Sequence, residues 1–315
     1  MLNGVLFFPV TPFGEDGEVD LAVLTEHVRR GVAAGPGAVF TACGTGEFHA
    51  LEVGEFARVV GATTNAVDRR VPVFAGAGGS ITQAKQFARA AADVGADGLL
   101  LLLPYLVGMP QQGLIDYVGA IAAETDLQIV VYHRANARFS EQGAVAVAQL
   151  PTVVGLKDGV GDIDLMGRIV QAVRESRAGV ETDFQFFNGL PTAEASQRAY
   201  RGIGVPLYSS AVFAFAPDIA LAYYAALERS DERLLDALLS RFYYPLVRLR
   251  DRTPGYAVAL VKAGVRLTGL DAGGVRPPLV DPTDDEVAQL AEIVTRGRAV
   301  LAGTANPSAQ AGATT

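Results

Sequence analysis

The sequence predicts a parallel (β/α)8 barrel that carries an additional layer of helices at its C-terminal end. Short apolar segments rich in Val, Leu and Phe alternate with helical segments eight times, at spacings of roughly 20 to 35 residues. After the eighth apolar segment the pattern becomes helical only. A doubly wound sheet is the alternative, but it usually has fewer units and a dinucleotide-binding fingerprint. The glycine cluster at 76–79 lacks the final glycine of that fingerprint, and we interpret it as a turn.

The eight strands are expected at residues 5–9, 38–41, 71–75, 98–103, 128–132, 152–157, 184–187 and 204–208. Their continuous apolar character is typical of strands that are buried on both faces. Helices should follow at residues 20–33, 52–67, from 80 onward, and at 110–124, 140–149, 162–176 and 192–201. Asp20 and Ser80 are suitable N-caps because their side chains can accept hydrogen bonds from free backbone amides.

Four further helices are expected at residues 217–228, 232–249, 254–268 and 284–302. We therefore divide the chain into a barrel at 1–215, a C-terminal helical extension at 216–302 and a tail at 303–315. The tail consists mostly of small and polar residues, so we expect it to be disordered.

Composition limits the classes of function. The chain of 315 residues is 50% hydrophobic and 19% charged, which is typical of a soluble globular protein. Its net charge of −8 and its lack of Lys/Arg-rich runs argue against nucleic acid and anionic membranes as partners. No apolar run approaches the roughly 20 residues that span a bilayer. A single cysteine, without a recognisable signal peptide, favours the reducing cytoplasm.

Lys157 is the most conspicuous candidate for chemistry. It ends the sixth predicted strand and is one of only three lysines, because the chain uses arginine for nearly all of its positive charge. An amine held against an apolar wall has a lowered pKa and can act as a nucleophile near neutral pH. The alternative is a solvated lysine at the start of a loop.

Other polar groups at the strand ends would face the same mouth of the barrel, where βα loops converge. Tyr132 could relay protons or simply pack at the rim. Thr45, with the backbone of Gly44 and Gly46, could bind a carboxylate. Arg134 could bind a second carboxylate or form an exposed salt bridge. Further candidates for substrate contacts are Asn188, Ser209 and Ser210.

The strand ends do not contain a carboxylate cluster or a metal-ligand spacing, so we expect neither a metal nor a cofactor. A thiol nucleophile built from Cys43 and His49 is a weaker alternative, since nothing in the sequence forces the two together. The residues favour attack of Lys157 on a keto carbon, which gives an imine that acts as an electron sink.

Four features resemble the dihydrodipicolinate synthase / N-acetylneuraminate lyase family over roughly residues 3 to 300: FPVTPF at 8–13, GTGE at 44–47, Tyr132 and GLKDG at 155–159. The resemblance implies a (β/α)8 class I aldolase or dehydratase with a helical C-terminal extension. It implies a Schiff base at Lys157, a proton shuttle at Tyr132 and binding of an α-keto acid carboxylate by Thr45. It also suggests a homo-oligomer, either a tetramer or a dimer.

Departures from the synthase pattern argue against dihydrodipicolinate synthesis. Gly44 replaces a threonine, Leu106 replaces a tyrosine, and Ala137 replaces an arginine. Five longer motifs instead resemble the branch that converts 5-dehydro-4-deoxy-D-glucarate to 2,5-dioxopentanoate, water and CO₂: residues 44–51, 157–163, 187–194, 208–217 and 255–265. His133 departs from this branch, in which asparagine is expected.

The partner expected from this resemblance is a small dicarboxylic keto sugar acid. A pyruvate-dependent aldolase or lyase of the same family is the enzymatic alternative, because it would share Lys157 and Tyr132. A non-catalytic sugar-acid sensor on the same barrel is a further alternative, in which Lys157 would be dispensable.

Overall fold

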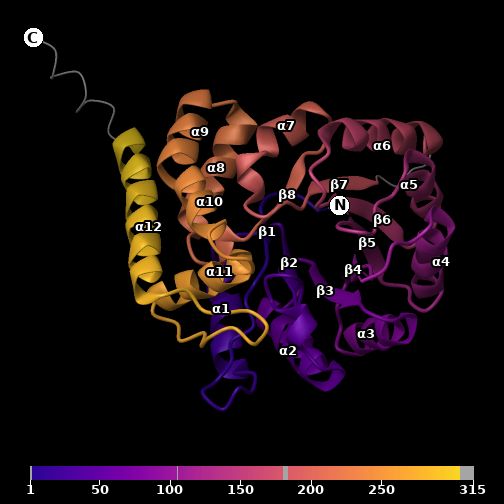
Figure 1. Cartoon of the computed structure of the whole chain (residues 1–315), viewed down its shortest axis with the longest axis horizontal. Coiled ribbons are helices and arrows are strands. Elements are labelled where there is room, and N and C mark those ends of the chain that lie inside the picture. Colours follow the sequence, from indigo (N-terminus) through magenta and orange to yellow (C-terminus); the bar gives the residue numbers. More distant parts are fainter. Residues whose placement is uncertain (1, 105, 180–183, 306–315) are drawn as a thin grey trace, which may run out of the picture.

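The predicted barrel is confirmed in a computed structural model, which describes residues 2–104, 106–179 and 184–305. Eight parallel strands form a closed barrel in sequence order, and β1 pairs with β8 to close it (Figure 1). The strands are β1 (Leu6–Phe7), β2 (Ala38–Thr41), β3 (Val73–Gly78), β4 (Gly98–Leu102), β5 (Gln128–His133), β6 (Val153–Asp158), β7 (Gln185–Asn188) and β8 (Leu207–Ser210).

Helices surround this barrel (Figure 1). The first seven are α1 (Leu21–Ala33), α2 (Val53–Val67), α3 (Ile81–Asp93), α4 (Gln111–Ala122), α5 (Glu141–Ala148), α6 (Ile163–Ser176) and α7 (Gln197–Gly202). Both predicted caps are confirmed: the Asp20 side chain accepts hydrogen bonds from the amides of Ala22 and Val23, and Ser80 accepts one from Gln83. Short 3-10 helices lie at η1 (Phe48–Ala50), η2 (Ala193–Ala195) and η3 (Val212–Ala214).

The glycine cluster at 76–79 is not a turn, as the sequence suggested, because Gly76 and Gly78 belong to β3. Close backbone approach explains these glycines. A Cβ atom on Gly76 would lie 2.3 Å from the Ala42 carbonyl oxygen, and one on Gly78 would lie 2.2 Å from that of Leu102. The glycines therefore let neighbouring backbone pack against the end of the strand.

Two predicted helices also differ from the structure: one begins later than predicted and the other is divided. The helix predicted at 192–201 begins only at Gln197, because Thr192 has a left-handed φ of 52° that no right-handed helix contains. The helix predicted at 232–249 divides into α9 (Glu232–Leu238), the π-helical η4 (Leu239–Tyr243) and α10 (Tyr244–Arg250). Pro245 lacks the amide that a continuous α-helix would bond to the carbonyl of Arg241.

The C-terminal layer consists of α8 (Pro217–Arg229), α9, η4, α10, α11 (Tyr256–Leu267) and α12 (Asp284–Ala305), and α12 lies at its outer edge (Figure 1). Helix α12 runs three residues beyond its predicted end. The division into a barrel and an extension stays a prediction. Most of the predicted disordered tail, residues 306–315, lies outside the described residues.

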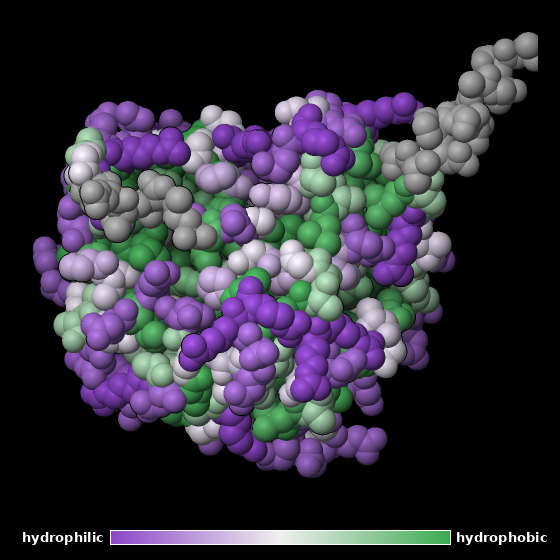
Figure 2. All heavy atoms as spheres, turned by 180° about the vertical axis from the view of Figure 1, so that it is seen from behind, coloured by the Kyte–Doolittle hydropathy of each residue, from purple (hydrophilic) through white to green (hydrophobic). Residues whose placement is uncertain are grey.

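The core has two parts. Inside the barrel, the rings of Phe8, Phe40 and Phe74 stack with centroids 4.8 and 4.9 Å apart. A larger apolar cluster fills the space between the strands and the surrounding helices. On the outer surface, hydrophilic residues are spread among apolar ones (Figure 2). The Phe8 end of this stack lies against Lys157, whose Nζ is 4.5 Å from the Phe8 ring centroid.

Candidate active site

A cavity of about 360 Å³ opens where the strand ends meet the C-terminal helices. Strand ends and βα loops contribute Phe8, Gly44, Thr45, His49, Tyr132, Arg134, Lys157, Gly189 and Ser209 to its wall. Helices α10 and α11 and the segments beside them contribute the other side, including Leu246, Arg250, Tyr256, Val258, Val261 and Leu279. The cavity therefore joins a polar barrel mouth to a largely apolar cover.

Lys157 points into this cavity from β6. It pairs in register with Tyr132 on β5 and is buried. Its Nζ atom lies 4.5 Å from the ring centroid of Phe8 and 4.4 Å from that of Tyr132. Burial lowers the pKa of Lys157 to about 7, with the nearby charge of Arg134 acting in the same direction. The amine can therefore lose its proton near neutral pH and act as a nucleophile.

We expect kcat/KM to rise with pH and to level off above an apparent pKa near 7, because only the neutral amine of Lys157 can attack a carbonyl carbon. The protonated amine, which predominates below that pKa, is not nucleophilic. Initial rates at low substrate concentration across the neutral range would measure this pKa. A profile that starts to fall only near the ordinary lysine pKa of about 10.4 would contradict the assignment.

Tyr132 lies beside Lys157 with its hydroxyl inside the site. The hydroxyl donates a hydrogen bond of 2.7 Å to the carbonyl of Gly189. Burial raises the pKa of Tyr132, so the phenol keeps its proton and can donate it. Gly189 must be a glycine here, because a Cβ atom would lie 2.6 Å from Cε of Lys157. The lysine and the tyrosine are thus packed into one unit.

The predicted carboxylate-binding loop lies at the same mouth. Gly44 and Thr45 line the cavity, whereas Gly46 is buried and is not part of its wall. The Gly46 carbonyl accepts a hydrogen bond of 2.7 Å from the buried Thr11 hydroxyl. Gly46 therefore shapes the turn that presents Gly44 and Thr45.

Arg134 lines the cavity from the loop after β5, with its guanidinium carbon 5.5 Å from the Tyr132 ring centroid. The sequence left open that Arg134 forms an exposed salt bridge. Within the described ranges, Arg134 forms no ion pair with a carboxylate. Its charge is available to an anion in the cavity.

Two of the remaining candidates lie outside the cavity wall. Asn188 is buried, and its amide donates to the Ala193 carbonyl, the Ser196 hydroxyl and the Gln197 side chain. The Ser210 hydroxyl donates to Glu194 Oε1 at 2.6 Å. Ser209, by contrast, lines the cavity. Asn188 and Ser210 thus hold the loops behind the site, while Ser209 faces the ligand space.

His133, the residue that departs from the expected motif, is also turned away from the cavity. Its Nδ1 accepts a hydrogen bond of 2.9 Å from the Phe139 amide, and its Nε2 lies 3.8 Å from Asp158 Oδ1. Burial lowers the pKa of His133, which favours the neutral ring. Asp158 also accepts a hydrogen bond from the Tyr200 hydroxyl. His133 therefore belongs to a buried network behind β5 and β6.

The thiol alternative is disfavoured by burial. Cys43 is fully buried and its Sγ donates to the Thr41 carbonyl. Burial raises the pKa of Cys43 to about 12, although the charge of Lys157 opposes the shift. The reactive thiolate form is therefore scarce near neutral pH.

Residues from the C-terminal helices were not among the predicted site residues. Arg250 on α10 lines the cavity and donates from Nη1 to the Thr192 hydroxyl at 2.9 Å and to the Pro191 carbonyl at 2.7 Å. In the sequence, only the family resemblance at 255–265 indicated that this region contributes to the site. The apolar pattern of residues 255–265 otherwise indicates only a buried helix. Of the three departures from the synthase pattern, Gly44 lines the cavity, Leu106 is exposed and Ala137 is buried.

Within the described part of the chain, no group of three or more His, Cys, Asp and Glu side chains is arranged to hold a metal ion. None of the helices in these ranges is both long enough and apolar enough to cross a membrane.

A (β/α)8 barrel with a buried lysine facing the cavity at its mouth is the arrangement expected of a Schiff-base enzyme. The chain belongs to the dihydrodipicolinate synthetase family, whose model matches residues 1–296. Dihydrodipicolinate synthase from Thermotoga maritima superimposes with a TM-score of 0.83 at 27% identity, over 95% of this chain and 99% of that one.

More similar relatives carry a more specific name. A probable 5-dehydro-4-deoxyglucarate dehydratase from Streptomyces griseus is 60% identical over 95% of this chain and 93% of its own length. A protein of the same name from Streptomyces coelicolor is 54% identical over 95% of this chain and 94% of its own. A relative so named from Pseudomonas putida is 39% identical, over 93% of this chain and 94% of that protein.

Proposed function

We propose that this protein dehydrates and decarboxylates 5-dehydro-4-deoxy-D-glucarate to 2,5-dioxopentanoate. The observation that carries the proposal is the buried Lys157 amine, which has a pKa of about 7 and faces the cavity beside Tyr132. The high identity to relatives named for this activity supports the choice of substrate.

The chemistry starts when the neutral amine of Lys157 attacks the keto carbon and water leaves, which gives an imine. The imine acidifies the neighbouring methylene, so that a proton leaves from it and the hydroxyl on the next carbon is expelled as water. The conjugated imine then accepts the electron pair released when the distal carboxylate departs as CO₂. The resulting dienamine is protonated on carbon, and its enol becomes the aldehyde. Hydrolysis by one water then frees the product and the amine, so each substrate dianion consumes one proton overall and releases one water and one CO₂. Tyr132 is the donor best placed for the proton transfers.

The substrate carries two carboxylates, and the cavity offers separate donors for them. Gly44 and Thr45 are the candidates for the carboxylate next to the keto group, and Ser209 lies on the same wall. Arg134 is the candidate for the second carboxylate. Arg250 also lines the cavity, but its guanidinium is already paired with Asp251 at 2.7 Å.

Replacing Arg134 by glutamine should raise KM by about tenfold to a hundredfold, because a charge-assisted hydrogen bond contributes about 1.5–3 kcal/mol. We expect kcat to change less. Steady-state kinetics with the diacid would measure both constants. Arg138→Gln is the matched control, since Arg138 lies in the same loop, is exposed and donates to the Ala135 carbonyl rather than lining the cavity. Equal KM values for the two variants would contradict the role of Arg134.

The proposed function is tested by incubating the purified protein with 5-dehydro-4-deoxyglucarate and measuring CO₂, 2,5-dioxopentanoate and pyruvate. Equal amounts of CO₂ and 2,5-dioxopentanoate without pyruvate would support the dehydratase. Pyruvate as the product would instead establish the aldolase alternative, which shares Lys157 and Tyr132.

We further propose that the protein acts in the cytoplasm as a homo-oligomer, a tetramer or a dimer. The single, buried cysteine is compatible with a reducing compartment, and the family resemblance supports self-association. Sedimentation analysis of the purified protein would test the assembly, and a monomer at all concentrations would refute it.

A further inference from the structure

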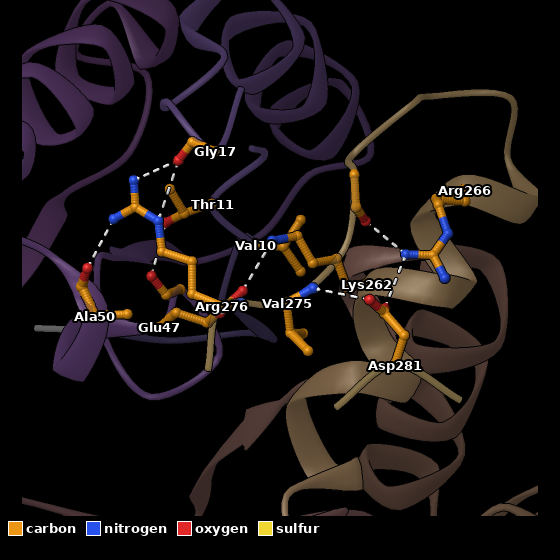
Figure 3. A network of polar contacts seen from close by, with 12 residues as sticks. Val10, Thr11, Gly17, Glu47, Ala50, Lys262, Arg266, Val275, Arg276 and Asp281 are labelled. Carbon is orange, nitrogen blue, oxygen red and sulfur yellow. Dashed lines mark hydrogen bonds and ion pairs between the residues drawn. The ribbon is translucent and has the colours of Figure 1, made fainter. Parts of the chain in front are cut away.

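A buried ion pair joins the carboxylate-binding loop to the C-terminal cover of the cavity. Glu47 follows the Gly44–Thr45–Gly46 turn, and its Oε1 accepts a hydrogen bond of 2.8 Å from Nζ of Lys262 on α11 (Figure 3). Both side chains are fully buried. Burying a charged group away from water costs free energy unless an opposite charge lies beside it. The pair therefore fixes the position of the loop after β2 relative to α11.

Glu47 also has an unusual backbone. Its φ of 55° and ψ of 42° lie in the left-handed region, which a residue with a Cβ atom rarely adopts. Its amide bonds to the Gly44 carbonyl at 3.2 Å, so this backbone conformation closes the turn that presents Thr45. The side-chain contacts of Glu47 therefore hold the turn in a conformation that the backbone alone would disfavour.

The second carboxylate oxygen of Glu47 bonds to the same C-terminal region. Oε2 accepts a hydrogen bond of 2.9 Å from the Arg276 amide. The Arg276 side chain donates to the Ala50 carbonyl (Figure 3). It also forms an ion pair with Glu55 on α2. Lys262 and Arg276 both lie on the face of Phe13, at 3.9 and 4.1 Å from its ring centroid. The loop after β2 is thus fastened to α11 and to the segment that follows it.

Helix α11 is itself a wall of the cavity, since Tyr256, Val258 and Val261 line it within the two turns that precede Lys262. We propose that Lys262 is a positioning residue: through Glu47 it fixes the carboxylate-binding turn relative to α11 and so sets the affinity for the carboxylate of the keto acid. This inference rests on the proposed Schiff base at Lys157 and on binding of that carboxylate by Gly44 and Thr45.

The test measures trapping of the Lys157 imine by borohydride at increasing concentrations of pyruvate or of acetone, which lacks a carboxylate. In Lys262→Met we expect the half-saturating pyruvate concentration to rise by about tenfold to a hundredfold. The reason is that the Gly44–Thr45 turn would be misplaced, and a displacement of about 1 Å can have an effect of this size. Trapping with acetone should not change. Glu47→Gln/Lys262→Met removes both charges, so it avoids an unpaired buried charge if the single variant folds poorly. It should show the same selective loss.

Arg298→Gln is the control, because Arg298 forms an exposed ion pair with Asp218 that joins α12 to α8 away from the cavity. This substitution should leave the trapping of both pyruvate and acetone unchanged. Unchanged pyruvate trapping in the double variant would overturn the inference, as would an equal loss for pyruvate and acetone, which would indicate a general structural role. An absence of any adduct in the wild-type protein would instead remove the Schiff-base function on which the inference rests.

Discussion

Lys157→Ala is expected to lower turnover of 5-dehydro-4-deoxyglucarate on the order of 10⁴-fold or more, because it removes the group on which the imine forms. The side chain occupies the end of β6 between the rings of Phe8 and Tyr132, and its pKa of about 7 makes it a nucleophile at neutral pH. Borohydride with substrate should inactivate the wild-type protein and add the reduced ligand to the peptide that contains Lys157.

Lys157→Arg separates nucleophilicity from charge. A guanidinium keeps a positive charge in the site but stays protonated and cannot form an imine. We therefore expect Lys157→Arg to be as inactive as Lys157→Ala and to give no adduct. Peptide mass mapping is decisive because only two other lysines exist, at 85 and 262. An adduct at either of these would refute the mechanism.

The barrel was predictable because its signal repeats. Each of the eight strands was predicted from a short apolar run, whereas some boundaries depend on local causes that a repeat cannot reveal. Gly76 and Gly78 resemble turn glycines, yet they extend β3 because neighbouring backbone lies too close for a Cβ atom. The break after α9 arises because Pro245 cannot donate the helical hydrogen bond that continuous periodicity would require.

The candidate site was predictable only to the level of the strand ends, because successive residues of a strand face opposite sides. Lys157, Tyr132 and Ser209 face the cavity, whereas their neighbours Asp158, His133 and Ser210 take part in buried networks behind the strands. The register of β5, β6, β7 and β8 decides which neighbour points inward. Sequence motifs contain both neighbours and do not distinguish them.

The contribution of α10 and α11 to the cavity could not be derived from sequence periodicity. An apolar helix face predicts burial without identifying its partner, and Lys262 in such a face could have been a solvated residue. Its pairing with Glu47, 215 positions earlier in the chain, exists only once the barrel has closed. The proposed positioning of the carboxylate-binding turn therefore depends on long-range packing that no local pattern encodes.

Tyr132→Phe should reduce kcat by about 10²- to 10⁴-fold, the range typical of a lost acid–base group. The phenyl ring would keep its packing against Lys157, where the Tyr132 ring centroid lies 4.4 Å from Nζ. Only the hydroxyl would be lost, together with its 2.7 Å hydrogen bond to the Gly189 carbonyl. Steady-state kinetics should therefore show a large loss in kcat with a much smaller change in KM, and slow imine trapping should remain detectable.

Tyr223→Phe is a matched control for this variant. The Tyr223 hydroxyl also donates a 2.7 Å hydrogen bond to a backbone carbonyl, that of Glu194, but it lies away from the cavity wall. Either substitution should reduce stability by about 1 kcal/mol through the lost hydrogen bond. Only Tyr132→Phe should slow the chemistry. Equal kcat values for the two variants would show that the Tyr132 hydroxyl serves packing at the rim, and proton transfer would then have to be assigned to another group in the cavity.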